Sequence, residues 1–475
     1  MNKKYHPTWE SLKSFVSPQW LRDAKFGIYT HWGVYSVPAC PPNATWYPYN
    51  MYRKGTEQYN YHVKTYGDPS KFGYKDFIPM FRAEKFDPDE WAEIFRNAGA
   101  KFAGPVAEHH DGFSMWDTAY SEWNAAKMGP KHDVVAELEK AVRKQNMKFF
   151  VALHHFENNF FYPHWHEEYD TANPEYAGLY GSPHDTGAVF DLDFGGQAKP
   201  DKAAHDKWLG KTKEIIDRFM PDAIWFDFGL RWVQEHYKRE MAAYYYNKAA
   251  EAGKDVCLMY KLNDMAAGTA MIDLEEGHFD NLMHNEWITD TTVDMGGGWG
   301  YLFNAEYKSP QTILHYLIDN VSKNGYLLLN VGPKANGEIP DEAKNILSEM
   351  GKWLSMNGES IYGTSPWLYS GEGPTKQSKS GDFTENEILE YTAGDFRYTA
   401  KGDNIYAICL SWSSGEYIMK QLGLLYPDEI ARVSMIGSDK PLAWTFRDNA
   451  LIVESPKTKP CDYAYVLKIE RKRPF

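Results

Sequence analysis

The stretch Asp222-Ala-Ile-Trp-Phe-Asp227 follows a proline, is apolar between its two acids and ends on a carboxylate. Its apolar part is too short and too uniform for a surface helix, which predicts a strand that is buried on both faces. In a (β/α) barrel, the chemistry is carried by side chains at the C-terminal ends of such strands. Asp227 is therefore a candidate catalytic residue. The alternative is that Asp227 only caps a following turn.

Apolar runs and helical patterns alternate on both sides of this stretch. We expect strands at 25–33, 102–109, 148–155, 256–262 and 325–331, weaker ones at 271–276 and 286–293, and helices at 88–98, 133–146, 204–220, 235–252, 309–321 and 340–356. This order predicts an α/β fold with an irregular (β/α)8-type barrel, because no clear pattern marks the fifth and sixth helices. The stretch 38–74 is rich in proline and tyrosine, and we expect it to form a long loop at the rim.

The texture of the sequence changes after Asn357-Gly358. Helical patterns end, and short alternating runs follow, for example at 388–391, 404–411 and 463–469. Such runs predict a C-terminal β-sandwich of about a hundred residues. We therefore expect two domains, a catalytic barrel at 1–365 and a β-sandwich at 366–475.

The composition is that of a globular protein with an excess of aromatic residues and of negative charge. Aromatic residues make up 16% of the chain, and the formal net charge is −14. Aromatic rings form large cores but also flat platforms for sugar rings, and composition does not separate the two. The negative charge argues against nucleic acid and anionic membranes as partners, since both bind basic patches.

Further features of the sequence bear on compartment and on cysteine chemistry. No apolar run reaches the roughly 18 residues of a membrane span. The four cysteines lack the spacing of a disulfide framework or a zinc site. The first residues hold no apolar stretch typical of a signal peptide. We expect an extracytoplasmic location if such a peptide precedes this sequence and a cytoplasmic one otherwise.

Histidines recur at the ends of three predicted strands. His31 ends the first, His109-His110 the second and His154-His155 the third. Imidazoles both donate and accept hydrogen bonds, which suits a ligand with several hydroxyls. Histidine pairs also suggest a metal site, but neighbouring residues on a strand point to opposite faces, so no single pair chelates easily. We expect neither a metal nor a cofactor.

Several of these stretches together resemble glycoside hydrolase family 29, the retaining α-L-fucosidases. The resemblance lies in the opening strand at 25–39, in the His-His-Asp-Gly-Phe motif at 109–113, in Trp-Phe-Asp at 225–227, in Asn-Val-Gly-Pro at 330–333 and in the closing helix at 353–362. It covers most of the chain. It implies a barrel enzyme that hydrolyses glycosides with two carboxyl groups about 5–5.5 Å apart.

The resemblance implies roles for individual residues. Asp227 matches the nucleophile, which has to stay ionised and so needs hydrogen-bond donors around it. Leu-Glu-Glu-Gly at 274–277 resembles a Leu-Glu-Arg-Gly stretch of some members, which favours Glu275 as the acid/base, ahead of Glu276 and Glu286. All three acids have a simple alternative role as surface residues of a loop. The residues expected to bind the sugar are His31, Trp46, His109, His110, His155, Trp225, Glu276 and Trp287.

The chain departs from common family patterns near the expected sugar site. Thr45 stands where many members have Glu, and Met265 where Arg is common, which predicts the loss of a carboxylate and of a cation. His154-His155 replaces a stretch that is often rich in tyrosine, and Phe-Gly-Leu at 228–230 stands where Gly-Asp-Trp is frequent. We therefore expect intact barrel chemistry around an altered sugar pocket.

These observations favour an exo-acting retaining α-L-fucosidase that acts on oligosaccharides or glycans. One alternative is an α-L-galactosidase on algal or host polysaccharide fragments, because L-galactose is L-fucose with one more hydroxyl and an apolar pocket rejects an added hydroxyl only about a hundredfold. A non-catalytic sugar-binding relative and a metal hydrolase built on the histidines are further alternatives. The sequence leaves open whether the chain forms a homo-oligomer.

Overall fold

The computed structural model describes residues 4–182, 200–377, 379–385, 389–438 and 440–472. Eight parallel strands close into a barrel in sequence order, and the last strand pairs with the first. They are β1 (Phe26–Thr30), β2 (Phe102–Glu108), β3 (Lys148–Leu153), β4 (Ala223–Phe226), β5 (Cys257–Lys261), β6 (Met271–Glu275), β7 (Trp287–Thr292) and β8 (Gly325–Val331). The predicted α/β barrel is confirmed, including both strands that the sequence marks weakly.

The helices predicted around the barrel are also present. They are α5 (Pro88–Asn97), α6 (Val134–Lys144), α9 (Lys202–Phe219), α10 (Glu235–Glu251), α11 (Pro310–Ser322) and α12 (Asp341–Asn357). No helix forms at 262–270 between β5 and β6 or at 276–286 between β6 and β7. The barrel is therefore irregular where the sequence has no helical pattern.

The stretch 38–74, expected to form a long loop at the rim, lines the cavity with Thr45 and Trp46 but is partly helical. This stretch holds the short helix α3 (Tyr47–Asn50) and the two-turn helix α4 (Glu57–Thr65). The described buried residues of α4 are Gln58 and His62, which are polar. Because polar side chains take the inward positions, the apolar periodicity that identifies a helix is missing.

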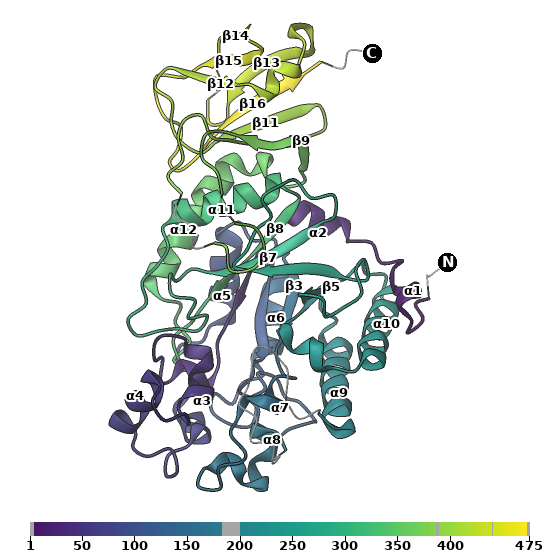
Figure 1. Cartoon of the computed structure of the whole chain (residues 1–475), viewed down its shortest axis with the longest axis vertical. Coiled ribbons are helices and arrows are strands. Elements are labelled where there is room, and N and C mark those ends of the chain that lie inside the picture. The colour runs from purple at the N-terminus through teal and green to yellow at the C-terminus, as the bar shows by residue number, and fades with distance from the viewer. Residues whose placement is uncertain (1–3, 183–199, 378, 386–388, 439, 473–475) are drawn as a thin grey trace.

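The remaining helices of the barrel domain are short. They are α1 (Trp9–Leu12), α2 (Gln19–Ala24), α7 (Asn158–Phe161) and α8 (Ala177–Tyr180). In Figure 1, α3, α4, α7 and α8 gather at the lower end of the molecule, on the far side of the barrel from the C-terminal sheets. They come from the segments after β1 and β3, so both insertions build the same end.

The C-terminal part forms two antiparallel sheets. A five-stranded sheet has the order β13-β16-β11-β10-β9, and a three-stranded sheet has the order β12-β15-β14. The strands are β9 (Ser365–Glu372), β10 (Phe396–Lys401), β11 (Asn404–Cys409), β12 (Glu416–Met419), β13 (Ile430–Met435), β14 (Trp444–Arg447), β15 (Ala450–Glu454) and β16 (Tyr465–Arg471). Of the predicted run at 388–391, residue 388 lies outside the described residues, and 389–391 form no strand.

The C-terminal sheets pack on the barrel through α11, with α12 beside it (Figure 1). Arg397 of β10 forms a buried ion pair with Asp319 of α11, and Lys323 contacts the same carboxylate at 2.7 Å. Ion pairs that are withdrawn from water need such matched partners. This contact fixes the second domain against the barrel.

The barrel interior is a packed core of its own. Phe102, Phe150, Met259, Tyr326 and Leu328 belong to one buried cluster inside the strands, separate from the larger cluster between strands and helices. These side chains close the barrel from below, so a ligand site can form only above them, at the C-terminal ends of the strands. Among the described residues, no helix is both long and apolar enough to cross a lipid bilayer.

Candidate active site

A cavity of about 550 Å3 lies at the C-terminal ends of the barrel strands. Its polar residues follow or end successive strands: Asp227 follows β4, Lys261 ends β5 and Glu275 ends β6. His31 follows β1 and His154 follows β3. Because parallel strands all point the same way, residues that are far apart in the sequence meet here.

Asp227 is a buried carboxylate surrounded by three nitrogen atoms. Its Oδ2 atom lies 3.0 Å from His154 Nδ1 and 3.4 Å from His110 Nε2, and its Oδ1 atom lies 3.3 Å from Lys261 Nζ. Burial alone raises the pKa of Asp227, but the charge of Lys261 and the two imidazoles outweigh burial and lower the pKa below its usual value. Asp227 is therefore ionised at neutral pH.

Glu275 is a carboxyl group whose pKa is raised, in contrast to that of Asp227. Burial raises its pKa to about 8, an effect that Lys261 opposes and that the nearby charges of Asp290 and Asp227 reinforce. Its Oε2 atom lies 2.6 Å from Lys261 Nζ. Because Asp227 and Glu275 each place an oxygen against the same ammonium group, these two oxygens lie within about 6 Å of each other. One carboxyl is held ionised and its neighbour protonated.

Lys261 is itself held in place by further acids and rings. Its Nζ atom lies 3.7 Å from Asp290 Oδ2 and 4.7 Å from the centre of the Trp225 ring. Tyr29 donates a hydrogen bond of 2.8 Å to the same oxygen of Asp290. Burial lowers the pKa of Lys261, but Asp290, Glu275 and Asp227 raise it well above its usual value. The lysine thus remains a cation between the two carboxyl groups.

Neutral imidazoles line the rest of the cavity floor. His31 Nδ1 lies 2.9 Å from Asn330 Oδ1, and the centres of the His109 and His154 rings are 4.5 Å apart. Burial lowers the pKa of His31 and of His109 well below the usual value, and lowers that of His110 to about 3. Uncharged imidazoles can both donate and accept hydrogen bonds.

Some polar atoms of the cavity residues have no hydrogen-bond partner among the described protein atoms. They include His109 Nδ1, His154 Nε2 and Trp225 Nε1. Buried polar atoms are normally satisfied, so such a cluster in one cavity indicates a polar ligand. The same cavity also exposes aromatic side chains, including Trp46 and Trp299. Polar groups beside aromatic rings are the mixture that binds a sugar.

Two overlapping groups of side chains in the cavity also have the chemistry of metal ligands. In each group, three candidate ligand atoms lie within 4.8 Å of one another. The groups are His31, His109 and His154, and His110, His154 and Asp227. The histidines come from different strands, so the alternation within each pair does not keep them apart.

Comparison with protein families identifies the chain. The profile described as Alpha-L-fucosidase matches residues 1–359, and that described as Alpha-L-fucosidase C-terminal domain matches residues 390–470. The chain belongs to the alpha-L-fucosidase family. It is thus a member of a glycoside hydrolase family, as the sequence motifs predict.

Similar proteins cover nearly the whole length of this family member. The tissue alpha-L-fucosidase of Bos taurus is 30% identical over 98% of this chain and 91% of that protein. The plasma alpha-L-fucosidase of Homo sapiens is 30% identical over 98% of this chain and 92% of that protein. The crystal structure of Thermotoga maritima alpha-fucosidase in complex with fucose is 29% identical, with a TM-score of 0.77 over 98% of this chain and 100% of that one.

The structure brings most of the predicted site residues of this family member into the one cavity. Besides Asp227 and Glu275, the predicted sugar-binding residues that line it are His31, Trp46, His109, His110, Trp225 and Glu276. Glu276 adopts a left-handed backbone conformation with φ of 42°, which turns the chain immediately after Glu275. Burial raises the pKa of Glu276 to about 7.

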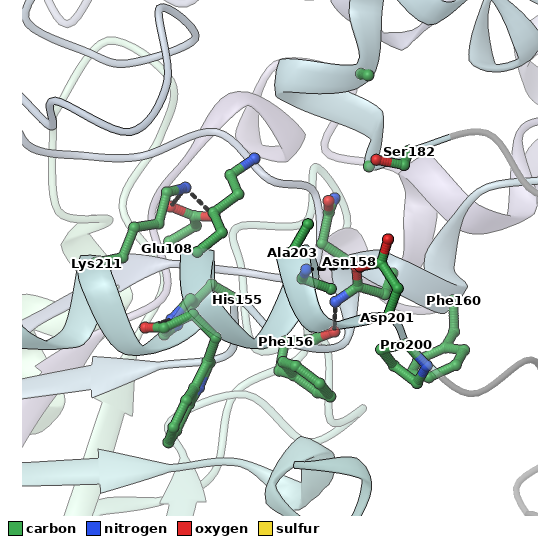
Figure 2. Close-up of a pocket in the computed structure, with 16 residues that line it drawn as sticks. Glu108, His155, Phe156, Asn158, Phe160, Ser182, Pro200, Asp201, Ala203 and Lys211 are labelled. Carbon is green, nitrogen blue, oxygen red and sulfur yellow. Dashed lines mark hydrogen bonds and ion pairs between the residues drawn. The ribbon is translucent and has the colours of Figure 1, made fainter. Parts of the chain in front are cut away.

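His155 lies outside this cavity. Its ring stacks on Trp208, with centres 6.1 Å apart, and it lines a second cavity beside the buried Glu108–Lys211 ion pair (Figure 2). The alternation of side chains beyond β3 explains the difference, because it sends His154 to the barrel mouth and the next residue to the other side. His155 thus lies at the predicted strand end but outside the cavity, which His154 lines instead.

Trp287 and Glu286 lie at the wrong end of β7. Trp287 is the first residue of that strand, and its indole donates to the backbone oxygen of Lys323. Glu286 pairs with Arg22 at 2.7 Å. Because the cavity opens at the C-terminal ends of the strands, neither the sugar-binding prediction for Trp287 nor the acid/base alternative Glu286 agrees with these positions.

The departures from common family patterns have different consequences in the structure. Met265 is buried in the hydrophobic core and does not line the cavity, and a different residue, Lys261, supplies a cation there. Thr45 does line the cavity, and its hydroxyl donates to Asn43 Oδ1 at 2.8 Å. The pocket is thus altered at Thr45 but keeps a positive charge.

Proposed function

We propose that this chain is an exo-acting retaining α-L-fucosidase, which releases terminal α-L-fucose from oligosaccharides or glycans. The observation that carries the proposal is the placement of Asp227 and Glu275 against one ammonium group, with their oxygens within about 6 Å. Retaining glycosidases hold their two carboxyl groups about 5–5.5 Å apart, whereas inverting ones need room for a water molecule between them. Membership of the alpha-L-fucosidase family supports the choice of sugar.

In the first step, Asp227 attacks the anomeric carbon of the fucose residue. The hydrogen bond from His154 and the charge of Lys261 keep it ionised for this attack. Glu275 gives its proton to the glycosidic oxygen as the bond from that oxygen to the anomeric carbon breaks. The products of this step are a fucosyl ester of Asp227, a free aglycone and an ionised Glu275.

In the second step, Glu275 acts as a base. It takes a proton from a water molecule, whose oxygen attacks the anomeric carbon and displaces the Asp227 carboxylate. Fucose leaves with its original anomeric configuration, and both carboxyl groups return to their starting states. Lys261 contacts both groups, so it faces one negative charge throughout, on Asp227 at rest and on Glu275 in the ester intermediate.

The sugar hydroxyls have partners on the cavity floor. His31, His109 and His110 are buried neutral imidazoles from two strand ends, and Trp46 and Trp225 supply ring surface and an indole N–H. Hydroxyls need donors and acceptors in fixed directions, which neutral imidazoles provide. Glu276 lies at the edge of the same cavity and accepts hydrogen bonds when it is ionised.

The test is hydrolysis of 4-nitrophenyl α-L-fucoside and of the α-L-galactoside by the wild type, with Asp227→Ala as the matched variant. We expect preference for the fucoside, a loss on the order of a thousandfold or more in Asp227→Ala, and rescue of that variant by azide. Preference for the galactoside would show that the substrate is an α-L-galactoside, cleaved by the same mechanism. Binding of fucose without hydrolysis of either glycoside would show that the chain is a non-catalytic sugar-binding protein. Full activity of Asp227→Ala would show that Asp227 is not the nucleophile.

A further inference from the structure

A loop of the C-terminal domain reaches the mouth of the barrel. Residues 381–384, which belong to the connection between β9 and β10, pair with the chain just after β6. The backbone N–H groups of Phe383 and Thr384 donate to the carbonyl oxygens of Glu275 and Glu276 at 2.7 Å and 2.9 Å. Asp382 accepts a hydrogen bond of 2.9 Å from the N–H of Glu275. The second domain is thus fastened to the backbone that carries the proposed acid/base.

The loop places an exposed aromatic ring beside the cavity. Phe383 lines the cavity and is 61% exposed. Its backbone has a φ of 56°, in the left-handed region that residues with side chains rarely adopt. Backbone conformations of this kind cluster at functional sites, where the surrounding contacts hold them. An aromatic ring at this place can pack on a group that is bound at the mouth of the cavity.

A second exposed apolar residue lies on the same rim. Leu262 follows Lys261 at the end of β5, lines the cavity and is 37% exposed. The floor below carries the charged and imidazole groups, so the rim and the floor differ in chemistry. Pyranose rings present apolar C–H faces that pack on flat aromatic side chains. The rim suits a second sugar, while the floor suits the hydroxyls of the first.

The position of Glu275 decides which sugar the rim receives. The proton of Glu275 goes to the oxygen between fucose and the aglycone, so the aglycone has to lie next to Glu275. The residue hydrogen-bonded to the backbone oxygen of Glu275 is Phe383. We propose that Phe383 and Leu262 form the platform for the aglycone sugar, so that a loop of the C-terminal domain sets the preference for the leaving group. This inference rests on the proposed function.

The experiment compares substrates with and without an aglycone sugar. The values of kcat/KM are measured for α-L-fucosyl fluoride and for a panel of α-L-fucosyl disaccharides with the wild type, Phe383→Ala and Phe303→Ala. Phe303 is the matched control, since it is 53% exposed and does not line this cavity. We expect the disaccharide-to-fluoride ratio to fall about tenfold in Phe383→Ala, as for the loss of one ring contact of this kind, and to stay unchanged in Phe303→Ala.

The outcomes separate this inference from the proposed function. Hydrolysis of the fluoride by both variants shows that the barrel is intact. An unchanged ratio in Phe383→Ala, or an equal fall in Phe303→Ala, would overturn the platform while the fucosidase activity stands. A wild type that cleaves neither the fluoride nor any disaccharide would overturn the proposed function, and the platform with it.

Discussion

The Nζ atom of Lys261 lies 2.6 Å from the Oε2 atom of Glu275. The same nitrogen lies 3.3 Å from Asp227 Oδ1, so one buried cation contacts both proposed catalytic carboxyl groups. A positive charge at this distance stabilises the ionised form of each acid. Lys261 therefore lowers the pKa of both groups, against the opposite effect of burial.

Replacement of Lys261 by Met is expected to move both limbs of the pH–rate profile upward. Without the ammonium group the pKa of Asp227 rises, so the nucleophile is protonated, and activity is lost, at a higher pH as the solution becomes more acidic. The pKa of Glu275 also rises, so the acid keeps its proton to a higher pH. Shifts of roughly one to three pH units follow from an opposite charge at this range. The profile of kcat/KM against pH measures both.

Lys261→Arg is the matched control, because it keeps the charge in a different shape. We expect its two limbs to lie closer to those of the wild type than the limbs of Lys261→Met do. A methionine variant with an unshifted profile would show that Lys261 does not set either pKa.

The identity of the acid/base is decided by the alkaline limb of the same profile. Burial raises the pKa of Glu275 to about 8, and the group has to be protonated to act. The value of kcat/KM should therefore be lost as the pH rises through about 8. Glu275→Gln should remove this limb and lower kcat/KM about a hundredfold or more for poor leaving groups. Glu286→Gln, which lies outside the cavity, is the control and should keep the limb.

Glu276→Gln tests the neighbouring alternative in the same assay. Glu276 lines the cavity, and its pKa is raised to about 7. If Glu276 were the acid, its replacement and not that of Glu275 would remove the alkaline limb. The two variants thus give opposite results for the two assignments.

The sequence predicts the barrel because its strands are short apolar runs and its helices have clear caps. Asp87, for example, accepts hydrogen bonds from the first backbone N–H groups of α5, as its place before a proline indicates. The barrel also places acids and histidines at one mouth, so candidates at strand ends could be named in advance. The α4 helix was missed because its buried positions hold Gln58 and His62.

The parts of the site that sequence reasoning missed depend on side-chain direction or on distant contacts. His154 and His155 are neighbours just beyond the end of β3. The alternation of side chains along a strand does not tell from the sequence which of the two faces the cavity. In the sequence, Lys261 is an ordinary basic residue at the end of a strand. Only the structure shows that three acids surround it. Phe383 reaches the cavity from a loop more than a hundred residues beyond Glu275, and no local pattern indicates this contact.

Glu157 is expected to position His110 from the Nδ1 side of its ring. It is buried, its Oε1 atom accepts a hydrogen bond of 2.7 Å from the N–H of Gly229, and its Oε2 atom lies 4.0 Å from His110 Nδ1. Burial and the charge of Asp227 raise its pKa well above the usual value, so it is a neutral acid that faces a neutral imidazole. Glu157 and Asp227 thus face the two different ring nitrogens of His110.

The corresponding prediction compares two replacements of Glu157. Glu157→Leu leaves the Gly229 N–H without its acceptor, and kcat should fall about tenfold, as expected for one lost buried hydrogen bond, with a smaller change in KM. Glu157→Gln keeps an acceptor for Gly229 and an N–H for His110, and should retain most of the activity. Equal activities of the leucine variant and the wild type would show that Glu157 does not position His110.

Removal of metal ions is expected to leave the activity unchanged, although histidines with the spacing of metal ligands line the cavity. One group, His110, His154 and Asp227, surrounds the carboxylate that Lys261 already contacts at 3.3 Å. A divalent ion bound there would be repelled by this ammonium group and would occupy the lone pairs of the nucleophile. The other group, His31, His109 and His154, supplies the imidazoles that we assign to the sugar hydroxyls.

The measurement is kcat/KM for the fucoside before and after dialysis against EDTA, and then with Zn2+ added back. We expect the same value after dialysis, and inhibition by Zn2+ that is competitive with the fucoside, because imidazole ligands suit zinc and the ion would take the place of the sugar. His109→Ala should weaken this inhibition by removing one of three ligands. If EDTA abolished the activity and Zn2+ restored it, the histidines would be ligands of a catalytic metal. The two-carboxylate mechanism would then be wrong.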